Sequence, residues 1–137
     1  MDAYQLAVVA SGVFFLNALL TGVWKYREMT ASPDGVAHAY VDISHRTSLL
    51  YAFACVLLAM FANISQLPAW LELLAMVLLV SYFALAVIIY MVHGWRKDTD
   101  NQMRKPSASL HQAMWSLIAA EIGGFLILFY GVLTALW

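Results

Sequence analysis

The side chains best suited to chemistry in this sequence are its four histidines and the acids near them. His38, Asp42 and His45 are spaced i, i+4, i+7 in a segment where a helix is expected. At about 100° per residue, this spacing places the three side chains within about 60° of one another on one helix face. Imidazole and carboxylate groups on one face can ligate a borderline metal ion, or fix the tautomer of a histidine base. The pattern therefore predicts a metal site or an acid–base site.

The other two histidines, His93 and His111, end and begin the two following apolar segments at the same expected membrane depth. We therefore predict one polar site, in which the three residues of the second segment face the bundle interior and meet His93 or His111. The candidate metal ligands are His38, Asp42, His45, His93 and His111. The alternative is that these groups face lipid headgroups and water.

Glu121 lies within the last apolar segment, ten residues beyond His111 and so about 15 Å deeper along a helix. Carboxyl groups inside a membrane are costly, usually face the bundle interior and usually serve a function. Two glycines follow Glu121 directly, and they allow another helix or a ligand to come close. Asn17 lies at a comparable depth, so a neutral Glu121 hydrogen-bonded to Asn17 is the structural alternative. The candidate catalytic residues are Asp42, Glu121 and Asn17.

Four apolar segments must position these residues: 4–24, 47–64, 69–92 and 114–137. Each is long enough, or nearly so, to cross a hydrocarbon core that needs about 20 residues. With 64% hydrophobic and 11% charged residues, the composition excludes a water-soluble fold. Long apolar runs without strand-like alternation form helices in lipid. The sequence therefore predicts an all-α integral membrane protein, a single domain over residues 1–137 that forms an antiparallel bundle of four transmembrane helices.

The second helix is predicted to extend well beyond its apolar part. Ser32, Pro33 and Asp34 supply a cap, a proline for the first helical position and an acid for the first turn. A helix from Pro33 to Ile64 would be about 46 Å long, whereas a bilayer core is about 30 Å thick. Its first turns should therefore project into the headgroups or beyond.

The basic residues predict the orientation. All seven lie around the loops that join the first two and the last two segments, while residues 63–70 contain none. The positive-inside rule places both basic loops in the cytoplasm and both termini outside, in what we expect to be a bacterial inner membrane. The net charge of -1 gives no nucleic-acid footprint. The expected partners are the lipid bilayer, a small apolar or aromatic substrate, and further copies of the chain in a small homo-oligomer.

Two short stretches, Leu19-Leu20-Thr21-Gly22 and residues 32–40 (Ser-Pro-Asp-Gly-Val-Ala-His-Ala-Tyr), resemble the four-helix membrane isomerases hydroxylaminobenzene mutase and styrene oxide isomerase. The resemblance implies an intramolecular rearrangement of a small aromatic substrate. In the epoxide-isomerising branch it also implies a trimer and a haem b whose iron acts as Lewis acid.

That branch places its histidine ligand after G-x-A-x-A, where this sequence has Tyr40, and His38 comes two residues earlier. Tyrosine and histidine both ligate haem iron. His38, Tyr40 and His45 are therefore the candidate cofactor-binding residues.

Two functional hypotheses follow. The first is an isomerase-like enzyme that uses haem b or a bound metal ion as Lewis acid, with Asp42 or Glu121 as acid or base. The second is a non-enzymatic membrane module that binds haem or a metal, or passes an ion or small solute. A scaffold that depends on a partner is a further option. No phosphate loop, nucleophile elbow, CxxC or HExxH pattern is present, which argues against the common soluble enzyme classes.

Overall fold

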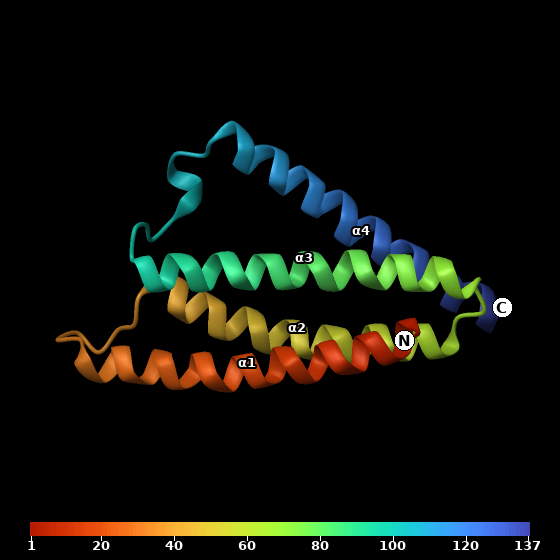
Figure 1. The fold of residues 1–137 in the computed structure, drawn as a ribbon, viewed down its shortest axis with the longest axis horizontal. Coiled ribbons are helices and arrows are strands. Elements are labelled where there is room, and N and C mark those ends of the chain that lie inside the picture. Colours follow the sequence, from red (N-terminus) through yellow and green to blue (C-terminus); the bar gives the residue numbers. More distant parts are fainter.

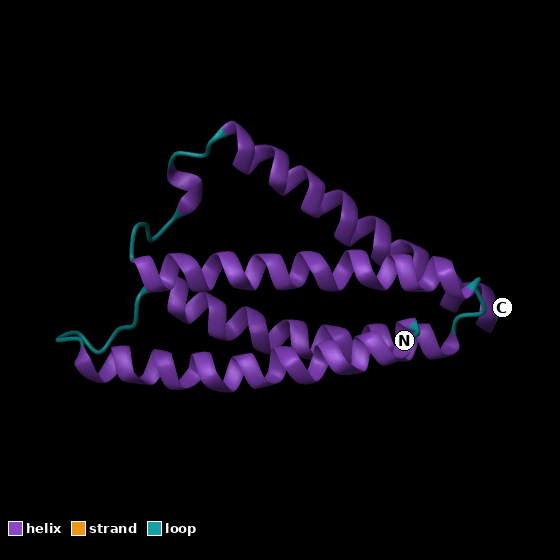
Figure 2. Cartoon of the chain, viewed as in Figure 1, coloured by secondary structure: helices purple, strands orange, loops and turns teal.

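Four long helices make up the protein in the computed structural model, which describes residues 1–137. They are α1 (Ala3–Ala31), α2 (Ala39–Ile64), α3 (Ala69–Arg96) and α4 (Ala108–Leu136), and a 3-10 turn, η1 (Gln102–Arg104), precedes α4. Each long helix is long and apolar enough to cross a membrane. The predicted all-α fold with four membrane-spanning helices is thus confirmed (Figure 2).

Consecutive helices run in opposite directions, so the two termini lie at the same end of the bundle (Figure 1). α1 packs against α2 and α3, and α4 packs against α2 and α3 without touching α1. The seven basic residues gather toward the other end, where α1 and α3 finish and where α2 and α4 begin. We call this the basic end of the bundle. The expected association into a small oligomer stays a prediction.

The predicted start of the second helix at Pro33 is wrong, because a tight turn separates α1 from α2. Asp34 accepts hydrogen bonds from the Ser32 hydroxyl and the Val36 N–H, and Gly35 has a left-handed φ of 70°. Side chains of this type compete with helical hydrogen bonding by bonding to nearby groups in a turn. The helix begins only at Ala39. At 26 residues α2 is about 39 Å long, still longer than the hydrocarbon core.

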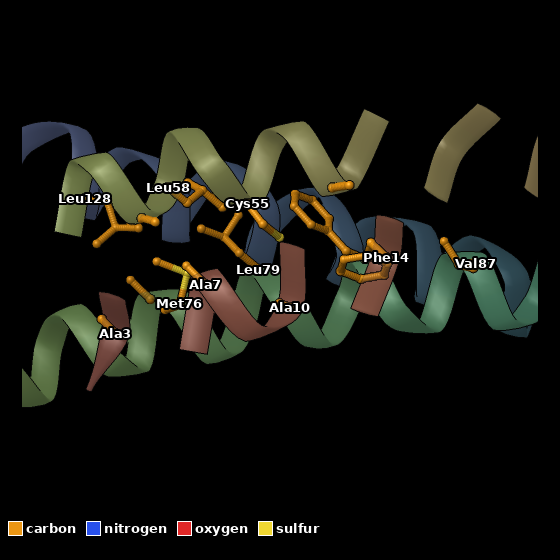
Figure 3. Packing of buried hydrophobic residues seen from close by; sticks show 14 residues of the cluster. Ala3, Ala7, Ala10, Phe14, Cys55, Leu58, Met76, Leu79, Val87 and Leu128 are labelled. Atoms are coloured by element: carbon orange, nitrogen blue, oxygen red, sulfur yellow. The ribbon is translucent and has the colours of Figure 1, made fainter. Parts of the chain in front are cut away.

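The hydrophobic core lies toward the end of the bundle that carries the termini. On α1 it is formed mainly by small residues that share one face, namely Ala3, Ala7 and Ala10, followed by Phe14. Small side chains allow the neighbouring helices to approach closely, which is how helices associate in a membrane. Met76 of α3, Leu128 of α4 and the single cysteine are fully buried in the same cluster (Figure 3). The core therefore joins all four helices at this end.

α4 belongs to this core only through its second half. Its buried residues are Gly124, Leu128, Gly131 and Val132. A Cβ atom added to Gly124 would lie 3.0 Å from the backbone oxygen of Ala75 and 3.0 Å from Leu79 Cγ, so the missing side chain is what lets α4 meet α3 here. Toward the basic end, α4 diverges from α3 (Figure 1). This divergence places the start of α4 away from the other helices.

Candidate functional site

His45 and Asp42 both face α1. The Nδ1 atom of His45 lies 2.8 Å from the carbonyl oxygen of Ala18, and the imidazole packs where Gly22 has no side chain. Asp42 forms ion pairs with Lys25 of α1 and with Arg46, one helical turn further along α2. Two of the three residues on the predicted polar face therefore serve the packing of α1 against α2.

His38 and Tyr40 begin α2, beside the end of α3. The Nδ1 atom of His38 caps the helix by accepting a hydrogen bond from the Tyr40 N–H at 3.3 Å. The Tyr40 side chain is buried, with its ring centroid 5.1 Å from that of His93 and 5.8 Å from that of Tyr90. Its hydroxyl oxygen accepts a hydrogen bond from the backbone N–H of Gln102 at 2.9 Å. Tyr40 thus anchors the loop that leads to α4.

His93 contacts an acid of that same loop. Its Nδ1 atom lies 2.7 Å from Oδ1 of Asp98. The hydrogen bond with His93 lowers the pKa of the Asp98 carboxyl below its ordinary value, and the charge of Arg96 acts in the same direction. Because the folded protein depresses this pKa, the stability that the contact contributes is fully present above the ordinary pKa of an aspartate and is lost as the pH falls through the lowered value.

The structure does not bring the five predicted metal ligands together. His45 and Asp42 contact α1, His93 contacts Asp98, and His111 is exposed at the start of α4. No three His, Cys, Asp or Glu side chains are arranged to hold a metal ion. The physical reason is that α1, and not α3 or α4, packs against the face of α2 that carries His45, while α4 diverges at the basic end.

A haem ligated by Tyr40 does not fit this arrangement. The phenol oxygen accepts a hydrogen bond from the Gln102 N–H, and the ring is buried beside the rings of Tyr90 and His93. His38 and His45 each use Nδ1 in a hydrogen bond, which leaves Nε2 as the atom that could reach iron. The contacts of Tyr40, His38 and His45 therefore do not support a haem site.

Glu28, which the sequence did not single out, organises the basic end. Its Oε1 atom accepts hydrogen bonds from Trp24 Nε1 at 3.3 Å and Lys97 Nζ at 3.0 Å, and its Oε2 atom accepts one from the backbone N–H of His38 at 2.9 Å. One carboxylate thereby joins α1, the start of α2 and the end of α3. The i, i+4 spacing of Trp24 and Glu28 could have indicated their contact from the sequence. No sequence pattern pointed to the contacts of Glu28 with Lys97 and with the backbone of His38.

Asn17 does not reach Glu121, so the structural alternative for Glu121 is wrong. The side-chain amide of Asn17 donates to Ser48 Oγ at 2.8 Å and to Met91 Sδ at 3.6 Å. Ser48 in turn donates to the carbonyl oxygen of Ser44 at 2.6 Å. Asn17 therefore ties α1 to α2 and α3, while α1 and α4 make no contact.

Like Glu72, Glu121 carries an unusual side-chain oxygen. Its Oε1 atom is buried and has no hydrogen-bond partner. The residue borders a cavity of about 310 Å³ between α2, α3 and α4, in which it is the only polar side chain. The other lining residues are Ala54, Leu57, Leu58, Leu79, Phe83, Ile122, Phe125 and Leu126. An unpaired buried polar group costs about 1–3 kcal/mol, so a polar ligand atom at this position would be stabilised.

The cavity has aromatic walls. Phe83 and Phe125 line it, and the ring of Tyr51 stacks on Phe83 with a centroid distance of 4.0 Å and an interplanar angle of 7°. A second cavity, of about 120 Å³, lies between α3 and the first half of α4 and has Tyr82, Tyr90 and Ser116 among its lining residues. The divergence of α4 therefore leaves space along α3 from the basic end to the neighbourhood of Glu121.

Comparison of the chain with protein-family models, with curated proteins and with solved structures found no match.

Proposed function

We propose that this protein is a membrane-embedded enzyme that isomerises a small aromatic substrate, with Glu121 as its general acid. The observation that carries the proposal is the buried, unpaired Oε1 atom of Glu121 at the edge of an apolar cavity with aromatic walls. Intramembrane carboxyl groups are functional by default. A site with one polar group among apolar side chains suits a small apolar ligand with one polar atom.

An aryl epoxide illustrates the reaction. The Glu121 carboxyl donates its proton to the epoxide oxygen, and the carbon–oxygen bond next to the aromatic ring breaks. A hydride then moves from the oxygen-bearing carbon to the adjacent cation, a carbonyl group forms, and the hydroxyl proton returns to the Glu121 carboxylate. The product is an isomer of the substrate, so the reaction needs no co-reactant. The faces of Phe83 and Phe125 would favour the transient positive charge.

Turnover of defined substrates tests this proposal. Purified protein in phospholipid vesicles is offered an aryl epoxide or an arylhydroxylamine, and products are separated by chromatography and identified by mass spectrometry. We expect a new species of unchanged mass, formed in proportion to the amount of protein. If both compounds react no faster than in protein-free vesicles, the enzymatic proposal is refuted. Saturable binding without turnover would instead support the non-enzymatic module.

We also propose that the basic end faces the cytoplasm of a bacterial cell and that both termini lie outside the inner membrane. The support is the gathering of all seven Lys and Arg residues toward one end of the bundle. A reporter that is active only outside the membrane should be active when fused after Trp137 and inactive when inserted after Gly35 in the first basic loop. The reverse pattern of activity would overturn the orientation.

A further inference from the structure

Two cavities meet at Trp24 near the basic end. The first, of about 440 Å³, lies between α1 and α3 and is lined only by apolar residues, namely Trp24, Ile88, Met91, Val92 and Trp95. The four residues from α3 are spaced i, i+3, i+4, i+7 and so form one stripe of that helix. The first cavity is thus an apolar groove that begins between two tryptophans and continues into the depth of the membrane.

The other cavity that borders Trp24, of about 500 Å³, lies along α1 and includes charged residues in its lining. Its lining residues are Leu20, Val23, Trp24, Arg27, Glu28 and Ala31. Arg27 is exposed and forms no ion pair within the protein. Glu28 directs its oxygens to Trp24, Lys97 and the backbone of His38. The free charge at this cavity is therefore the guanidinium of Arg27, one helical turn from Trp24.

We propose that these two cavities form a binding site for one anionic phospholipid. An acyl chain lies in the apolar groove, and the phosphate contacts Arg27. Basic pockets between membrane helices bind acidic lipid head groups, and tryptophans mark the level of the head groups. From Arg27 to Leu20 the site extends about 10 Å along α1, from the boundary into the hydrocarbon region.

Charge complementarity favours an anionic lipid over a zwitterionic one. The ammonium group of a zwitterionic head group would bring a positive charge toward Arg27, which forms no ion pair within the protein. A guanidinium also pairs with phosphate through two parallel hydrogen bonds. The site should therefore select lipids by the head group, while the apolar groove accepts any acyl chain.

Tryptophan fluorescence tests the site directly, because bromine atoms on a lipid acyl chain quench a tryptophan that they contact. Trp70→Phe, Trp115→Phe and Trp137→Phe leave Trp24 and Trp95 as the only tryptophans. This background is reconstituted in mixed vesicles in which either phosphatidylglycerol or phosphatidylcholine carries the bromine. From the quenching of these tryptophans we expect phosphatidylglycerol to bind about fivefold more tightly than phosphatidylcholine at low salt.

The matched variants are Arg27→Gln and Lys105→Gln in the same background. Both remove one positive charge from exposed side chains at the basic end, but only Arg27 borders the cavity. Arg27→Gln should abolish the preference, Arg27→Lys should keep part of it, and Lys105→Gln should leave it unchanged. The proposal is overturned if the unsubstituted background shows no preference, or if Arg27→Gln and Lys105→Gln behave alike.

Salt dependence provides a measurement that needs no variant of Arg27. Raising the ionic strength from about 0.01 M to about 1 M shortens the Debye length from about 30 Å to about 3 Å. The preference for phosphatidylglycerol should fall with this change. A preference that does not depend on salt would contradict a site based on the charge of Arg27.

Discussion

Replacing Glu121 by Gln is expected to lower the rate of aryl-epoxide isomerisation by about 10²- to 10⁴-fold, the typical contribution of a general acid. Glutamine keeps the shape of the side chain and can still donate a hydrogen bond, but it cannot transfer a proton to the epoxide oxygen. Substrate binding in the cavity should change much less, because the other lining residues are all apolar and remain in place. Initial rates and the Kd for the substrate, measured in the same vesicles, separate the two effects.

Glu72→Gln is the control for this experiment. Glu72 also has a buried Oε1 atom without a hydrogen-bond partner, but it lies in the first turn of α3, about 10 Å along the helix from Leu79. It does not line the cavity that contains Glu121. The Glu72 variant should therefore keep its activity within about threefold, well short of the loss expected when a general acid is removed. Full activity in Glu121→Gln, or equal losses in the two variants, would exclude Glu121 as the general acid.

Replacing Gly124 by Leu should detach the second half of α4 from α3. The new side chain would meet the backbone oxygen of Ala75, which cannot move aside as a flexible side chain can, and Leu79, which lines the cavity near Glu121. Overpacking of this kind typically costs about 1–3 kcal/mol. We expect the free energy of unfolding, measured by titrating dodecyl sulfate into mixed micelles, to fall by about this amount, and isomerisation to be lost with it.

The neighbouring glycine provides a matched control. A Cβ atom added to Gly123 would have nothing within 4 Å, so Gly123→Leu introduces the same side chain on a face of α4 with open space. Helix propensity changes equally in the two variants. The Gly123 variant should therefore unfold at the same or a higher detergent fraction than the unsubstituted protein. Equal destabilisation of the two variants would show that α4 does not depend on a close approach at Gly124.

Sequence patterns predicted the membrane architecture correctly because the bilayer leaves few alternatives. A long apolar run must form a helix in lipid, since no water is present to satisfy its backbone. Residues 69–92 were predicted as a span and lie within α3, and residues 4–24 lie within α1. The start of α2 was missed because proline and acid signals favour a turn as well as a helix start. Here Gly35 and the hydrogen bonds of Asp34 produce the turn, and α2 begins at Ala39.

The sequence by itself determined the number of helices and the concentration of charge toward one end, because apolar character and the position of basic residues are properties of single segments. Only the tertiary structure decided which helix faces meet. Lipid is as apolar as the side chains, so helix association depends on small residues and on individual polar contacts between segments. For that reason the approach of α4 at Gly124, the turning of His45 toward α1 and the unpaired oxygen of Glu121 became visible only in three dimensions.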